Sequence, residues 1–132
     1  AQDQLAGSMT EDDRHEMEHM GDLVRVMLRT VLDAFARIDI KTAVKVVEAD
    51  IKVDNKYDSI TRQLVTYMAQ EPKMIPEILN ILWAARALER IGDRCENIAE
   101  YIFYLVKGRD LRHLSKDDEL AEMAAASGAS ED

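Results

Sequence analysis

Four acidic side chains recur at spacings of four, three and four in the stretch LERIGDRCENIAE, residues 88–100. They are Glu89, Asp93, Glu96 and Glu100. In an α-helix these spacings place the carboxylates in one row, where like charges repel by about 0.2–0.5 kcal/mol per pair. Because hard cations prefer oxygen ligands, the row is a candidate site for a metal ion or for basic groups of a partner protein. Simple exposure of the acids to solvent is the alternative.

Two more acids interrupt an apolar stripe between residues 43 and 68. The stripe recurs every three or four residues and comprises Ala43, Val47, Asp50, Asp54, Tyr57, Thr61, Leu64 and Met68. Aspartate is unfavourable inside a helix and costly to bury without a partner. Acid pairs one turn apart on facing helices suit a cation, so the candidate metal ligands are Asp50, Asp54, Glu89 and Asp93. Solvated aspartates, or aspartates paired with nearby arginines, remain open.

Three arginines flank the acidic row at four-residue spacing: Arg86, Arg90 and Arg94. They can meet acidic groups of a partner protein or a phosphate, which makes them candidate partner-binding residues. Arg86 and Arg90 also lie three residues before acids and can screen them.

The sequence HEMEH, residues 15–19, formally matches a zinc-peptidase motif, with His15 and His19 one turn apart. A peptidase needs a third ligand and a substrate cleft, which a small helical bundle does not offer. Glu16 and His19 form one Glu-x-x-His unit, but ferritin-like sites use that unit on two helices. Cys95 lies among core positions, which disfavours a reactive thiolate. We therefore expect a protein that is not an enzyme.

The breaks in the pattern predict three long helices. The chain of 132 residues contains 5 Gly and 2 Pro and suits one helical domain. We expect helices over residues 10–37, 41–69 and 76–107, with Asp13 as a capping signal, Pro72 and Pro76 in the second break, and Gly108 after the last helix. Short connections predict an all-α, antiparallel up-down-up three-helix bundle with long helices like those of spectrin repeats.

The third helix carries an apolar seam that should face the core. The seam consists of Ile81, Ala84, Leu88, Ile91, Cys95, Ile98, Ile102 and Leu105. Its spacing alternates between three and four, as in a bundle core. The acidic row should then lie on roughly the opposite side, and Tyr67 should pack against Trp83.

Composition also indicates domain limits and location. We expect residues 1–9 to be an N-terminal extension or a cloning remnant, 10–113 the bundle, and 114–132 an acidic flexible tail. The net charge of −9 argues against binding to nucleic acid or anionic lipid. The absence of an uncharged 18-residue stretch argues against membrane insertion, and a polar start and a single cysteine favour the cytoplasm.

Two stretches resemble a known family. ALERIGDRCENIAEYIFYLVKGRDLRH, residues 87–113, closely resembles the end of a PhoU domain, and EADIKVDNKYDSITRQLVTYMAQEP, residues 48–72, resembles its second helix. PhoU proteins regulate phosphate uptake and phosphate signalling in bacteria. The resemblance covers about residues 14–114 and is to the C-terminal one of the two bundles in a typical PhoU.

This resemblance implies a negative regulator of phosphate uptake and of the phosphate-starvation response, acting on transcription indirectly. Its implied partners are the ATPase of the phosphate transporter (PstB-like) and a sensor kinase (PhoR-like). Some members bind iron or zinc clusters through an acid-x-x-x-Asp motif, which maps here onto the four candidate ligands, with Glu96, Asn97 and Glu100 as accessory residues. Iron, zinc, manganese or magnesium is the expected metal.

A single bundle in place of two predicts a homodimer that pairs equivalent bundles. Two alternatives from other classes are a metal-binding or metal-storage bundle and a purely structural oligomerisation module. The first would carry metal at fixed stoichiometry. The second would associate without depending on the acidic row.

Overall fold

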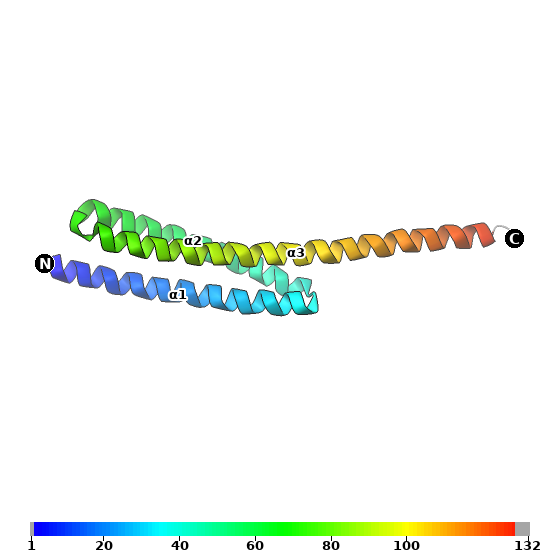
Figure 1. The fold of residues 1–132 in the computed structure, drawn as a ribbon, viewed down its shortest axis with the longest axis horizontal. Helices are drawn as coiled ribbons and strands as arrows, with labels where there is room; N and C mark the ends of the chain where they lie inside the picture. Colours follow the sequence, from blue (N-terminus) through cyan, green and yellow to red (C-terminus); the bar gives the residue numbers. More distant parts are fainter. Residues whose placement is uncertain (1, 129–132) are drawn as a thin grey trace.

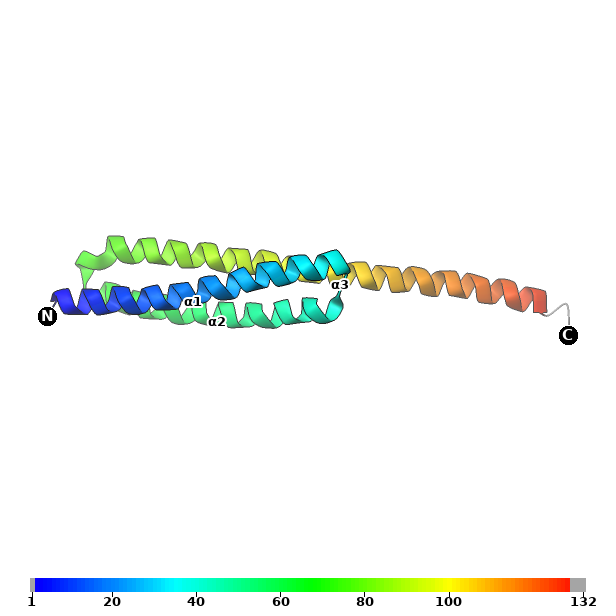
Figure 2. The ribbon, with the colours of Figure 1, turned by 90° about the horizontal axis from the view of Figure 1, so that it is seen from below.

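The computed structural model describes the backbone of residues 2–128 and the side chains of residues 11–109, 118 and 120–126. It consists of α1 (Gln2–Arg37), α2 (Ile40–Gln70), the short 3-10 helix η1 (Pro72–Met74) and α3 (Ile75–Gly128). The three long helices lie side by side and alternate in direction, and α3 continues past the other two (Figures 1 and 2). The predicted all-α three-helix bundle is confirmed. None of these helices, over the residues described, is long and apolar enough to cross a bilayer.

The two corners of the bundle form where the sequence breaks its helical pattern. At the first corner, Asp39 caps α2: its carboxylate accepts hydrogen bonds from the Thr42 backbone at 3.3 Å and the Thr42 hydroxyl at 2.7 Å. At the second corner, Glu71 is extended and Pro72 opens η1. Pro76 then occupies the first turn of α3, where its missing N–H costs nothing.

Two predicted helix ends are wrong. The helix α1 begins at Gln2, so Asp13 lies in its interior and caps nothing. The helix α3 continues through Gly108 to Gly128. A single glycine costs a helix only about 1 kcal/mol, which the helix-forming residues on either side of Gly108 offset. The division into a bundle and a flexible tail stays a prediction, and residues 1 and 129–132 lie outside the described part.

Six of the eight residues in the predicted seam of α3 are buried or partly buried, and two are exposed. Cys95 and Ile102 are buried, whereas Ile91 and Ala84 are exposed. Small residues seven apart, at Ala85, Gly92 and Ala99, occupy the core side instead. They let α3 approach the other helices closely, which a prediction weighted toward large side chains does not detect. The core seam is therefore rotated toward the acidic row, and the row borders the core instead of lying opposite it.

The expected packing of Tyr67 against Trp83 in the core is also wrong. Trp83 is 75% exposed. Tyr67 is partly buried, and its hydroxyl accepts a hydrogen bond from Nε2 of Gln63 at 3.1 Å.

Candidate metal centre

Five carboxylates from α2 and α3 gather beside the core. They form two groups: Asp50, Asp93 and Glu96 in one, and Asp54, Glu89 and Asp93 in the other. Within each group, one carboxylate oxygen per residue lies within 4.8 Å of the others. Asp93 belongs to both groups. The geometry can therefore offer three oxygen ligands to each of two cations, with one shared residue between them.

Asp50 lies at the buried end of this cluster. Its side chain is 2% exposed, and Oδ1 has no hydrogen-bond partner. A buried, unsatisfied polar atom costs about 1–3 kcal/mol, more when it is charged. Gly92 leaves the space that this carboxylate occupies, because a Cβ atom at that position would lie 3.0 Å from Oδ1. A cation at the cluster would satisfy the unpaired oxygen.

Burial and mutual repulsion disfavour the ionised form of several carboxylates in the cluster. Burial raises the pKa of Asp50 to about 8, with further contributions from a hydrogen bond with Glu96 and from the charges of Asp54, Glu96 and Asp93. Burial and neighbouring acids also raise the pKa values of Asp54 and Glu89. A divalent cation would reverse these shifts, because it favours the ionised carboxylates.

Of the three candidate arginines, only Arg86 interacts with the cluster. Hydrogen bonding with the Tyr57 hydroxyl raises the pKa of Arg86, and the Arg86 charge acts to lower the pKa of Glu89. Arg90 and Arg94 are exposed. Over the side chains that the structure describes, no ion pair joins either of them to the acidic row. These two guanidinium groups are therefore available to a partner.

The three residues predicted to be accessory ligands lie in different surroundings. Glu96 belongs to the group with Asp50, so it is as well placed as the four expected ligands. Glu100 is exposed and lies outside both groups. Asn97 borders an apolar groove between α1 and α3, together with Leu32, Phe35, Ile98 and Tyr101. It therefore lies away from the carboxylates that face α2.

The HEMEH segment forms no second metal centre within the described side chains. His15 and His19 are exposed and belong to neither group of candidate ligands. Glu16 instead pairs with Nζ of Lys56 at 3.2 Å. That contact ties α1 to α2.

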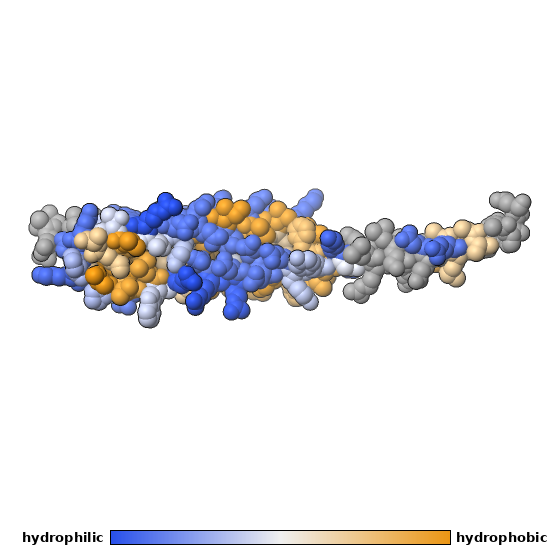
Figure 3. All heavy atoms as spheres, turned by 90° about the horizontal axis from the view of Figure 1, so that it is seen from above, coloured by the Kyte–Doolittle hydropathy of each residue, from blue (hydrophilic) through white to orange (hydrophobic). Residues whose placement is uncertain are grey.

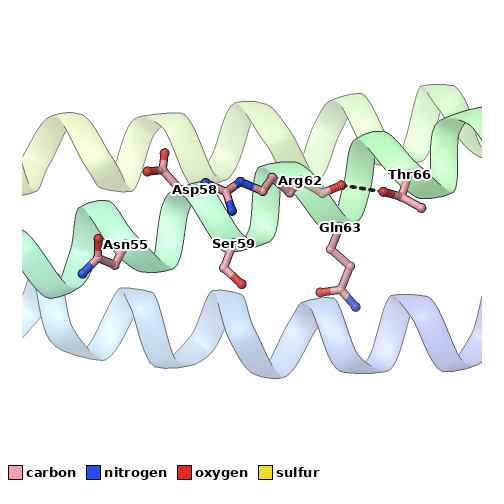
Figure 4. A pocket seen from close by; sticks show the side chains of 6 residues that line it. All are labelled: Asn55, Asp58, Ser59, Arg62, Gln63 and Thr66. Carbon is pink, nitrogen blue, oxygen red and sulfur yellow. Dashed lines mark hydrogen bonds between the residues drawn. The ribbon is translucent and has the colours of Figure 1, made fainter.

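A polar groove follows the outer face of α2 and is a weaker candidate. It is lined by Asn55, Asp58, Ser59, Arg62, Gln63 and Thr66. Figure 4 shows these side chains spread along one helix, with Ser59 and Gln63 toward α1 and Asp58 toward α3. The bond drawn between them runs from the Thr66 hydroxyl to the Arg62 carbonyl, 2.9 Å, within the helix itself. The groups do not converge on a common point, so the acidic cluster is the better site.

Sequence reasoning missed one buried acid. Asp13 is fully buried, and neither carboxylate oxygen has a hydrogen-bond partner. Burial, with the charges of Asp12 and Glu16, raises its pKa to about 6. The available signal was its spacing: Asp13 lies seven residues before Met20, itself seven before Met27, and so occupies a core position of α1.

Together, the fold and the cluster define a three-helix bundle with an acidic centre between two of its helices. The PhoU domain model matches residues 17–102, and the chain belongs to the PhoU family. It is 52% identical over 102 residues to the phosphate-specific transport system accessory protein PhoU of Escherichia coli (strain K12), covering 77% of this chain and 42% of that protein. It is 50% identical over 99 residues to the PhoU homolog of Pseudomonas aeruginosa, covering 75% and 41%.

A solved structure agrees with the fold. The crystal structure of PhoU from Pseudomonas aeruginosa matches with a TM-score of 0.66 and 49% identity, covering 69% of this chain and 44% of that one. The chain thus spans less than half the length of these relatives.

Proposed function

We propose that this chain takes part in the negative regulation of phosphate uptake and of the phosphate-starvation response, without catalytic activity of its own. The observation that carries the proposal is about 50% identity, over most of the bundle, to relatives named accessory proteins of the phosphate-specific transport system. The shared fold agrees with a related role.

Regulation would operate through contact with other proteins. The proposed partners are the transporter ATPase and the sensor kinase, whose nucleotide-binding parts place the complex in the cytoplasm. Arg86, Arg90 and Arg94 lie exposed on α3 and suit acidic groups on such partners. The active form is proposed to be a homodimer.

A metal at the acidic cluster is the second part of the proposal. Asp50, Asp54, Glu89, Asp93 and Glu96 would hold it. Its charge would offset the burial and the repulsion that raise the pKa values of Asp50, Asp54 and Glu89. The unpaired Oδ1 of Asp50 supports the fit. An all-oxygen set suits manganese, magnesium or iron, and zinc also accepts carboxylates. Because the ligands come from two helices, metal would fix α2 against α3.

Elemental analysis tests the metal. The chain, purified without a histidine tag, should carry metal at near-integer stoichiometry, and the variant with Asp50→Asn, Asp54→Asn, Glu89→Gln and Asp93→Asn should carry none. Glu100→Gln is the matched control, because Glu100 lies outside both groups. The proposed metal site is refuted if the parent chain holds no metal and takes up neither manganese, magnesium, iron nor zinc on titration.

Capture of the transporter ATPase and of the cytoplasmic part of the sensor kinase tests the regulation. The chain should bind at least one of them, and a variant with Arg86, Arg90 and Arg94 changed to alanine should bind more weakly. A variant with Arg25→Ala and Arg29→Ala is the control, since these two arginines are exposed on α1. If the chain neither binds a partner nor alters a phosphate-starvation reporter in cells, the regulatory function is wrong.

A further inference from the structure

An apolar patch is exposed where α2 and α3 meet at the second corner. It comprises Val65 of α2 and Leu79 and Trp83 of α3, which we call the corner patch. Figure 3 shows an apolar area on the surface at the end of the bundle far from the α3 extension. Single exposed apolar residues are common, but Leu79 and Trp83 lie one turn apart on α3, and a largely exposed tryptophan is typical of an interaction surface.

The border of the corner patch is basic. Arg86 and Arg90 are exposed one and two turns after Trp83. The chain as a whole carries a formal net charge of −9, so this basic border is a local departure from an acidic surface. A surface of this kind fits an acidic segment that also carries apolar side chains.

The chain contains such a segment. Where α3 extends beyond the bundle, Leu120 and Met123 are exposed together with Asp118 and Glu122. Figures 1 and 2 show this part of α3 as a single helix with no other helix beside it. Two large apolar side chains therefore lie in solvent beside acids, on a part of α3 that has no other described helix of the same copy next to it.

The corner patch and the extension cannot meet within one copy. Both belong to α3, which is one continuous helix from Ile75 to Gly128. Trp83 and Met123 are forty residues apart in the sequence, so at 1.5 Å per residue they are about 60 Å apart along that helix. Contact between them requires a second copy of the chain.

We propose that two copies pair through α3 in antiparallel orientation, with the corner patch of each copy against residues 118–123 of the other. The two-fold axis then lies between residues 101 and 104, where Tyr101 and Tyr104 are exposed. Trp83 and Tyr101 are eighteen residues apart, five helical turns, and so share one side of α3. This pairing refines the homodimer of the proposed function by naming its surface.

Symmetry doubles the gain from each contact. In a two-fold dimer every contact occurs twice, so Trp83 meets Leu120 and Met123 at both ends of the interface. The same register brings Arg86 near Asp118, which gives complementary charges beside each apolar contact. Tyr101 already stacks on Phe35, with ring centroids 6.3 Å apart, which holds one residue at the axis in place.

Cross-linking tests the register. The chain with Trp83→Cys and Met123→Cys should form a covalent dimer on mild oxidation, because the two introduced thiols cannot reach each other within one helix. Neither single substitution should do so, since the pairing separates equivalent positions; the native Cys95 is buried. A covalent dimer of the Trp83→Cys chain alone would place two corner patches face to face and overturn the antiparallel pairing.

Fluorescence of the unmodified full chain supplies an independent test, because Trp83 is the only tryptophan. Its emission should shift to the blue with rising protein concentration, in step with dimer formation in sedimentation. Leu120→Glu with Met123→Glu should weaken dimerisation by more than about tenfold and abolish the shift. Ile51→Glu, at an exposed apolar residue of α2, is the control and should retain both.

The outcomes separate this proposal from the proposed function. A chain that stays monomeric at all concentrations, or whose Trp83 emission changes only when another protein is added, overturns the pairing. Metal content is measured on the same sample and does not depend on the pairing. Capture of the ATPase or the kinase uses Arg86 and Arg90 as well, so it is also measured on the Leu120→Glu, Met123→Glu variant, in which these arginines are unchanged. A monomer that binds metal and partners would therefore refute this inference alone.

Discussion

A Cβ atom on Gly92 would lie 3.0 Å from Oδ1 of Asp50, and 3.5 Å from Cγ1 of Val53. The backbone of α3 therefore comes against side chains of α2 at the position where the acidic cluster begins. The close approach that packs the bundle also delivers the buried carboxylate to Asp93 and Glu96. Both the close packing of α3 on α2 and the geometry of the acidic cluster thus depend on the absence of a side chain at Gly92.

Gly92→Ala should weaken metal binding while leaving stability nearly unchanged. The added methyl group must displace the Asp50 carboxylate, since the contact is shorter than ordinary van der Waals distance. Alanine gains up to about 1 kcal/mol in helix propensity, which offsets the crowding. Titration with Mn²⁺ should show a loss of about tenfold or more in affinity.

Gly108→Ala provides the matched control, because a Cβ atom there meets nothing within 4 Å. It should keep the affinity for Mn²⁺ and raise the melting temperature. Equal Mn²⁺ affinity in the Gly92→Ala and Gly108→Ala variants would contradict a role for Asp50 in the site.

Asp93→Asn should reduce metal binding more than any other single change in the cluster. Asp93 is the residue that both groups of carboxylates share, whereas Glu89 belongs to one group. Calorimetry should show loss of all strong sites in Asp93→Asn, and retention of one site in Glu89→Gln. The two-group geometry is wrong if the two variants bind Mn²⁺ alike.

Local chemistry explains what the sequence could predict. Pro72 and Pro76 break a helix wherever they occur, and acids four residues apart on α2 and α3 share a helix face in any fold. Both signals are short-range, so the three helices, the second corner and the pairing of the acids followed from them. The family resemblance rested on residues of the same two helices.

The remaining features depend on which face of each helix is covered. Gly92 and Ala85 lie outside the predicted seam and become core positions only because α2 and α3 pack closely. Asp13 was predicted to be a cap, but α1 begins at Gln2 and places it in the helix interior. The rotation of the α3 core side toward Gly92 also places Glu96 beside Asp50. These features depend on contacts between helices, so the periodicity of residues within one helix does not predict them.

Asp13→Asn should change how stability depends on pH. The pKa of Asp13 is about 6 in the folded chain, against 3.8 for an unperturbed aspartate. Between these values the folded state holds a proton that the unfolded state has released, so stability falls as pH rises. The loss is complete above pH 6 and amounts to roughly 3 kcal/mol, at about 1.4 kcal/mol per unit of pKa.

Urea denaturation of both chains at pH 4.5 and pH 7, with a chelator present, checks this. The free energy of unfolding of the parent should fall relative to that of Asp13→Asn between the two values. Because the acidic cluster titrates in both chains, its contribution cancels in the difference. A constant difference across this range would show that Asp13 is not buried as an unpaired acid.

Ile38→Gly should stabilise the chain. Ile38 has φ = 50°, the left-handed region that β-branched side chains rarely adopt. The Asp39 amide donates a hydrogen bond to the Ala34 carbonyl at 2.9 Å, and the Ile38 amide donates one to the Phe35 carbonyl at 3.2 Å. This pair of hydrogen bonds normally ends a helix at a glycine. Relief of this strain should exceed the added entropy of the unfolded chain by about 0.5–1 kcal/mol.

The neighbouring substitution Ile40→Gly is the control, since Ile40 is the first residue of α2 and has a negative φ. It removes a partly buried side chain without relieving strain and should lower the melting temperature, whereas Ile38→Gly should raise it. A higher melting temperature for Ile38→Gly together with a lower one for Ile40→Gly would locate the backbone strain at Ile38, in the first corner. If both variants lose stability, the apolar contact of Ile38 outweighs its backbone strain.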